Sequence, residues 1–213
     1  MRKNTFIPFV IALVAILGAL LAGCEEDKIY DIVIGSDICP DSTFNQNSAS
    51  EIFTDTVYVE AGQDIDDALK KNGYSRESIK AAILNGAYYS VTEWVPPVPP
   101  QTDWKISGAI MIKRTDLGPL APEDTLVVYA EASVRGALGN EITAKLAPGG
   151  VDIVNQALED FLDGANPAFR LVVLNGDCDP NPSLSNRIIF KWYACLQVQI
   201  VIEETTSVFD PLK

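Results

Sequence analysis

The segment from Arg187 to Glu203 constrains the fold most strongly, because apolar and polar side chains alternate along all of it. Apolar residues fall on every second position from Phe190 to Ile202, and residues such as Lys191 and Gln199 fill the positions between them. A period of two residues places the two sets of side chains on opposite faces of a strand. We therefore expect one long strand with a buried face and a wetter face.

The preceding sequence predicts shorter strands separated by turns rich in Gly and Pro. We expect strands at residues 52–60, 79–94, 104–114, 125–134, 141–147 and 169–174, and short amphipathic helices at 64–71 and 151–163. The run Pro96–Pro100 predicts a stiff connection or, alternatively, a ligand for an aromatic groove. About seven strands with one or two short helices indicate a mainly β fold, an antiparallel β-sandwich.

The N-terminus has the pattern of an export signal. Arg2 and Lys3 precede an apolar run from Phe9 to Leu21, which is shorter than the ~20 apolar residues of a membrane-spanning helix. Leu21-Ala22-Gly23-Cys24 follows directly. This tetrapeptide, placed after such a run, resembles the lipobox of bacterial lipoproteins.

The resemblance implies that a diacylglycerol is attached to the Cys24 thiol, that residues 1–23 are removed, and that the new amino terminus is acylated. Two or three acyl chains would hold the protein stably on a membrane. Glu25-Glu26-Asp27 resembles the signal that exports some Gram-negative lipoproteins to the outer leaflet of the outer membrane, the alternative being a solvated tether. The alternatives to a lipobox are an ordinary secretory signal and an uncleaved N-terminal helix. In both, Cys24 would be an unmodified thiol.

This interpretation divides the chain into three parts. They are a signal peptide at 1–23, a lipidated N-terminus and flexible tether at 24–50, and the β-sandwich domain at 51–213. Within the tether, Ile29–Ile34 is the one stretch that could add an edge strand. Residues 52–203 also resemble a set of uncharacterised bacterial envelope lipoproteins, in which a helix similar to Val151–Asp163 precedes two terminal strands. That set has no assigned activity, so the resemblance implies fold rather than function.

The cysteines can be assigned in more than one way. Lipidation of Cys24 would leave Cys39, Cys178 and Cys195, and an oxidising compartment permits one disulfide among them. We favour Cys39–Cys178, because both residues lie in Asp/Pro turn sequences whereas Cys195 lies inside a strand pattern. Metal binding by these thiols is less favoured, because the chain has no CxxC motif and no His.

Charge and composition exclude several functions. The chain has 213 residues, with 29 acidic and 16 basic side chains, a net charge of −13 and no His. Such an acidic chain has no basic surface for phosphates, so we expect no nucleic-acid partner. The absence of His removes Ser/His/Asp and Cys/His nucleophiles and His-ligated zinc. We therefore expect no enzyme and no cofactor beyond the lipid on Cys24, with calcium the one candidate metal.

Oxygen-rich clusters provide the candidates for cation binding and for acid–base chemistry. Asp177, Asp179 and Asn181 alternate like the start of a calcium loop, but the Gly and Glu that an EF-hand needs further on are missing. Carboxylate pairs perform glycoside hydrolysis without His. The clusters available for it are Asp64/Asp66/Asp67, Glu159/Asp160/Asp163 and Glu203/Glu204.

Exposed aromatic side chains are the candidates for saccharide contact. The alternation buries Trp104 and Trp192, which leaves Trp94 and Tyr193 as the better exposed rings. Taken together, the sequence predicts a lipid-anchored outer-membrane protein of the cell envelope, of binding or structural type. Its expected partners are the membrane and either envelope proteins or saccharides. The alternative is a carboxylate-dependent glycoside hydrolase or a saccharide-binding module.

Overall fold

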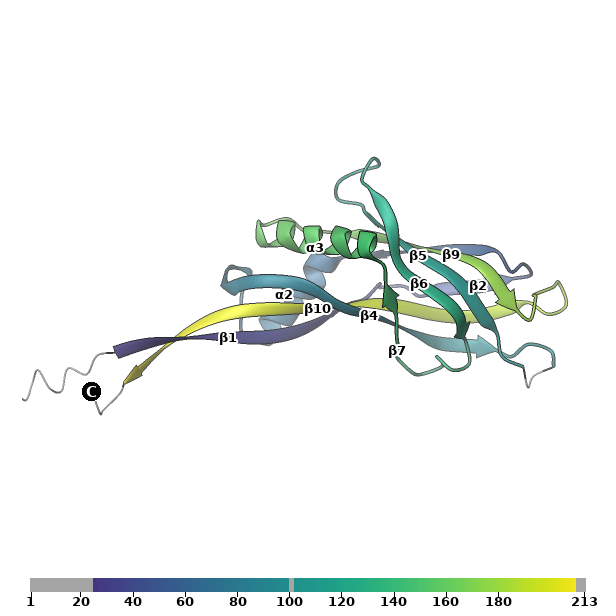
Figure 1. Ribbon diagram of the computed structural model, residues 1–213, viewed down its shortest axis with the longest axis horizontal. Coiled ribbons are helices and arrows are strands. Elements are labelled where there is room, and N and C mark those ends of the chain that lie inside the picture. Colours follow the sequence, from purple (N-terminus) through teal and green to yellow (C-terminus); the bar gives the residue numbers. More distant parts are fainter. Residues whose placement is uncertain (1–24, 100–101, 210–213) are drawn as a thin grey trace, which may run out of the picture. The chain divides into compact units, whose positions relative to one another are not determined.

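The computed structural model describes residues 25–99 and 102–209 (Figure 1). The predicted signal peptide and Cys24 lie outside the described residues. The helices and strands are β1 (Glu25–Ile38), β2 (Phe44–Ser48), β3 (Phe53–Val59), α2 (Ala61–Lys71), β4 (Ile79–Val95), β5 (Lys105–Arg114), β6 (Glu123–Ser133), β7 (Ile142–Thr143), β8 (Lys145–Leu146), α3 (Pro148–Leu162), β9 (Phe169–Asp179) and β10 (Ile188–Phe209). A 3₁₀ turn at Arg76–Ser78 precedes β4.

The described chain forms two compact units. The larger contains residues 33–202, and the smaller contains the start of β1 (25–32) and the end of β10 (203–209). None of the described helices combines the length and apolarity needed to cross a bilayer.

Two five-stranded antiparallel sheets confirm the predicted β-sandwich. In the first, sheet A, the order is β1-β10-β4-β7, with β2 also paired to β10. In the second, sheet B, the order is β3-β9-β5-β6-β8. The described residues form ten strands against the predicted seven, because β1 and β2 are additional and the predicted strand at 141–147 is divided into β7 and β8. Aromatic contacts join the sheets: Phe53 meets Phe190 at 6.4 Å between ring centroids, and Tyr129 meets Trp192 at the same separation.

The range predicted as a flexible tether contains strands. β1 begins at Glu25 and β2 ends at Ser48, and both pair with β10. The predicted edge strand at Ile29–Ile34 is confirmed as part of β1. The larger unit begins at Val33, whereas the domain was expected to begin at residue 51, because β1 and β2 pair with β10.

At one edge of the sandwich, the carboxylate of Asp55 connects the two sheets through hydrogen bonds. Asp55 of β3 accepts hydrogen bonds from the Asn45 backbone N–H at 2.6 Å and from the Gln46 side chain at 3.4 Å, both in β2. These bonds connect an edge strand of sheet B to β2 of sheet A. An edge that is covered in this way is not available for pairing with another chain.

Helix α3 packs against β4 of sheet A and against β5 and β6 of sheet B (Figure 1). Its buried stripe contains Val154, Ala157, Leu158 and Phe161. The helix begins at Pro148, three residues before the predicted start at residue 151, because proline is tolerated in the first helical turn. Gly150 also allows a close approach: a Cβ there would lie 2.3 Å from the Leu126 Cα of β6.

Candidate functional site

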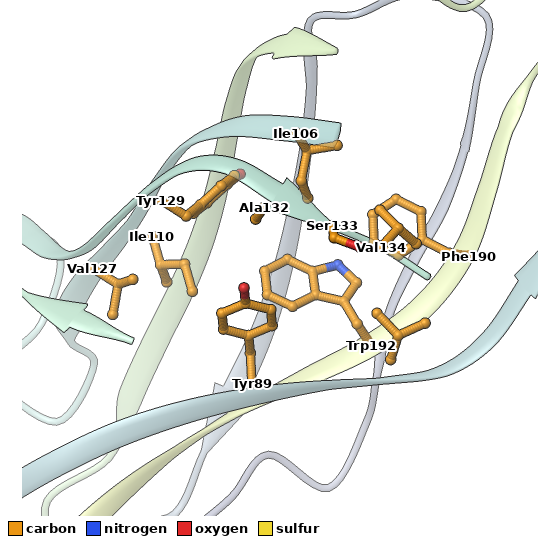
Figure 2. Close-up of a pocket in the computed structure, with 11 residues that line it drawn as sticks. Tyr89, Ile106, Ile110, Val127, Tyr129, Ala132, Ser133, Val134, Phe190 and Trp192 are labelled. Atoms are coloured by element: carbon orange, nitrogen blue, oxygen red, sulfur yellow. The ribbon is translucent and has the colours of Figure 1, made fainter. Parts of the chain in front are cut away.

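A small internal cavity lies between the two sheets (Figure 2). Sheet A contributes Tyr89, Phe190 and Trp192 to its lining, and sheet B contributes Ile110 and Tyr129 among others. Its volume is about 20 Å³, which is enough for about one water molecule. At this size the cavity does not accommodate a sugar ring or an acyl chain.

Trp192, which lines the cavity, carries a buried indole N–H that makes no hydrogen bond. Its side chain is 3% exposed and stacks on Phe44 at 4.6 Å between centroids. Figure 2 shows its indole beside the Tyr89 ring, and the two rings meet edge to face at 6.3 Å. The Trp192 Nε1–H is buried without a hydrogen-bond partner. A buried unpaired donor costs free energy, and this N–H is not exposed at the surface of the cavity.

The two tyrosines at the cavity stay neutral. Burial raises the pKa of the Tyr89 phenol and that of the Tyr129 phenol. The Tyr129 hydroxyl donates to Asn175 Oδ1 at 3.4 Å. Asn175 is buried in turn, and its Nδ2 donates to the backbone carbonyls of Glu51 and Asp177. The surface that the cavity exposes is apolar, and no carboxylate is among its lining residues.

Trp94 and Tyr193, the predicted ligand contacts, do not form one platform. Trp94 lies opposite Phe190 and Tyr193 lies opposite Ser90 in the β4–β10 register. Phe190 lines the internal cavity, so Trp94 and Tyr193 belong to opposite faces of sheet A. The Arg135 guanidinium lies 5.8 Å from the Trp94 ring. Both rings are only partly exposed, which reduces the face available to a sugar.

The disulfide joins Cys39 to Cys195, with 4.5 Å between their Cα atoms. The predicted Cys39–Cys178 pair is therefore wrong. Cys39 follows β1 directly, and β1 lies beside β10, which carries Cys195. Cys178 belongs to β9 in the other sheet, where it lies opposite Ile106 and is fully buried.

Cys178 remains a free thiol. Burial, together with the negative charges of Asp177, Asp179 and Glu51, raises its pKa to about 12. A thiol with such a pKa is almost entirely protonated at neutral pH, and the thiolate is the nucleophilic form. Cys178 therefore acts as a small apolar residue of the core.

The predicted calcium residues do not gather around one point. Asp177 and Asp179 are exposed strand residues of β9, and Asp179 lies opposite Lys105. The Asn181 amide, oriented as a donor, reaches the Glu51 carboxylate at 3.1 Å and the Cys178 carbonyl at 2.9 Å. Within the described ranges, no group of three or more His, Cys, Asp or Glu residues is arranged to hold a metal ion.

The predicted carboxylate clusters are engaged in local structure. Asp66 of α2 forms an ion pair with Arg76 at 2.7 Å, and the Arg76 guanidinium also lies over the Phe161 ring at 3.9 Å. Asp64 accepts a hydrogen bond from the Cys39 backbone N–H at 3.1 Å, and burial raises its pKa. Asp160 of α3 pairs with Arg114.

The remaining acids of these clusters lie on the surface. Asp67 lies 3.8 Å from Lys70, and both are well exposed. Glu159 and Asp163 are exposed on α3, and Glu203 and Glu204 are exposed in the smaller unit. None of the clustered carboxylates lines the internal cavity.

Sequence reasoning identified part of the cavity lining and missed the rest. The alternation in β10 and β5 places Trp192, Ile106 and Ile110 on the inner faces. Tyr89 and Tyr129 were not identified, because which strands face each other across the sandwich depends on long-range topology. Comparisons of this chain with protein-family models, with curated proteins and with solved structures find no match.

Proposed function

We propose that this chain is a lipid-anchored protein of the bacterial cell envelope, of binding or structural type and without catalytic activity. The Leu21–Cys24 sequence is the basis of the anchor. The Cys39–Cys195 disulfide is the structural observation that supports export, because disulfides persist mainly in oxidising compartments. Glu25-Glu26-Asp27 favours the outer membrane and display on its outer leaflet.

The start of the larger unit fits this arrangement. That unit begins at Val33, nine residues after the cysteine that would become the first residue of the mature chain.

The chemistry of the candidate sites supports a binding or structural role over catalysis. The internal cavity carries neutral phenols and an indole, and its volume of about 20 Å³ admits no large substrate. Asp66 and Asp160 are held by arginines, as acids that stabilise a fold commonly are. With no His in the chain, a general base near neutral pH would require a carboxyl of strongly raised pKa or a lysine of strongly lowered pKa.

Metabolic labelling with a palmitate analogue tests the anchor. Wild-type protein should carry the label and fractionate with outer membranes, and Cys24→Ala should lose both properties. Cys178→Ala is the matched cysteine control and should be labelled like the wild type. Equal labelling of wild type and Cys24→Ala, or no labelling of either, would overturn the proposal.

A further inference from the structure

A depression on the outer face of sheet B is lined by basic side chains. We call it the basic groove; it has a volume of about 440 Å³ and is lined by Tyr58, Lys113, Arg114, Thr115, Gly118, Pro119 and Arg170. Its lining contains three basic residues and no acidic one, although the whole chain has 29 acidic and 16 basic side chains. Acidic partners adjoin the groove, because Asp116 and Asp160 pair with Arg114 and Glu123 pairs with Arg170.

Strand register brings the functional side chains of the groove into one row. Tyr58 lies opposite Arg170 in the β3–β9 pair, and Arg170 lies opposite Lys113 in the β9–β5 pair. Lys113 lies opposite Glu123 in the β5–β6 pair. The neighbours of this row along each strand, including Val57, are buried, so the row itself faces outward.

The three cations of the groove are not equally available. Arg114 is 4% exposed and its guanidinium is bound to Asp116 and Asp160, so it forms the floor. Arg170 donates to Glu123 at 2.9 Å through Nη2, and 34% of its side chain remains exposed. The Lys113 ammonium donates to the Pro119 carbonyl, which uses one of its three protons. Arg170 and Lys113 are therefore the groups that can receive an anion.

Tyr58 supplies a flat apolar face beside these cations. Its side chain is 62% exposed, although it sits in the middle of a strand. An exposed aromatic ring presents an electron-rich face, against which the C–H groups of a sugar ring can pack. The adjacent Arg170 has the planar fork of donors that matches a carboxylate.

We propose that the basic groove binds an acidic saccharide, with the sugar carboxylate at Arg170 and Lys113 and one sugar face on Tyr58. This inference deepens the proposed function by naming a class of ligand for the binding module. It rests on the proposed function in one respect, because a protein at the cell envelope would meet such a ligand. An extended anionic bilayer is a less suitable ligand, because the net charge of −13 would repel it. A single carboxylate inside the groove would lie nearest to Lys113 and Arg170, which line it.

Calorimetric titration of the full-length protein in detergent tests this proposal, with trigalacturonate as the acidic probe and maltotriose as the neutral one. Trigalacturonate should bind and maltotriose should not. Arg170→Gln and Lys113→Gln should each weaken binding about tenfold or more, because each removes a charge-assisted hydrogen bond. Tyr58→Ala should weaken it about fivefold. Lys105→Gln, at the far end of β5, is the matched control and should bind like the wild type.

Several outcomes would overturn the saccharide assignment. They are no binding of trigalacturonate by folded wild type, equal binding by Arg170→Gln, and equal or tighter binding of inorganic phosphate or of phosphatidylglycerol vesicles. Thermal melts establish that each variant is folded, so a lost signal reports on the groove. The anchor is tested separately, since Cys24→Ala should bind trigalacturonate like the wild type whether or not Cys24 carries lipid.

Discussion

Arg114, at the end of β5, pairs with Asp160 of α3 and so connects the helix to sheet B. The arginine is 4% exposed, and its guanidinium also holds Asp116, whose carboxylate accepts a further hydrogen bond from the Ala168 backbone N–H at 3.4 Å. Three segments of the chain therefore meet at one buried guanidinium. Burying a charge costs free energy, so a buried arginine is compatible with a stable fold only when its carboxylate partners are present.

Replacing the arginine should be costly. Arg114→Met removes the partner of two carboxylates, and breaking a buried ion pair in this way costs about 3 kcal/mol. Urea unfolding followed by circular dichroism measures the loss. Lys105→Met, an exposed change at the other end of β5, should alter the free energy of unfolding by less than about 0.5 kcal/mol. Equal stability of Arg114→Met and wild type would contradict the structural role of the pair.

The same pair predicts a pH dependence. Burial by itself would raise the pKa of Asp116, but hydrogen bonds from Arg114 and Ala168 hold it below its usual range, and the Arg114 hydrogen bond lowers the pKa of Asp160. A carboxyl with a lowered pKa stabilises the fold above its unfolded pKa, and that stabilisation disappears as the pH falls through the folded pKa. Wild type should therefore lose stability below about pH 4, and Arg114→Met should lose less over the same range.

Gly108 in β5 tests how closely the strands approach. A Cβ at this position would lie 2.2 Å from the Leu174 carbonyl oxygen of β9. Gly108→Ala should destabilise the fold by about 3 kcal/mol, because backbone must shift to relieve the clash. Gly176→Ala in β9 is the matched control, since a Cβ there meets nothing within 4 Å. Thermal unfolding of the two variants measures the difference. Equal melting temperatures for Gly108→Ala and Gly176→Ala would contradict the close approach of β5 and β9.

The disulfide should be detectable by chemistry and by stability. Peptide mapping without reductant should recover a Cys39–Cys195 linkage, with Cys178 alkylated only after unfolding. Cys39→Ser with Cys195→Ser should lower the free energy of unfolding by about 2–4 kcal/mol, as expected for a bridge that closes a long loop. Cys178→Ala serves as the control for loss of a thiol. Recovery of a Cys39–Cys178 linkage would contradict the structure.

The internal cavity gives a prediction about small apolar ligands. Trp192→Ala should destabilise the sandwich by about 3–5 kcal/mol and enlarge the cavity. An enlarged apolar cavity binds benzene, so saturating benzene should raise the melting temperature of the variant and leave that of the wild type unchanged. A benzene effect of the same size on both proteins would show that the cavity is already large or that benzene binds elsewhere.

Local sequence patterns predicted where the strands and helices lie better than they predicted which strands and cysteines pair. The alternation from Phe190 to Ile202 belongs to β10, and the apolar stripe around Val154 and Leu158 belongs to α3. The pairing of Cys39 with Cys195 was missed, because it depends on β1 and β10 lying side by side. Strands β1 and β2 lie in the range predicted as a tether, and they were not predicted in full because their formation depends on pairing with β10.

The residues of the proposed basic groove were harder to predict than the fold. Tyr58 and Arg170 read as ordinary outward positions on two separate strands, and only the β3–β9 register places them opposite each other. Trp94 and Tyr193 were selected as exposed aromatics, but directly opposing residues fix them on different faces of sheet A. The signal that could have identified the groove is the placement of Lys113 and Arg170 on the polar faces of strands in an otherwise acidic chain.

Intact-mass spectrometry of the protein purified from bacterial membranes tests the central claim most directly. The lipid-anchored account predicts a chain that begins at Cys24 and carries the added mass of a diacylglycerol and an amino-terminal acyl chain. After reduction, the fragment containing Cys24 should hold all of that added mass. A chain that begins elsewhere, or an unmodified Cys24, would contradict the account.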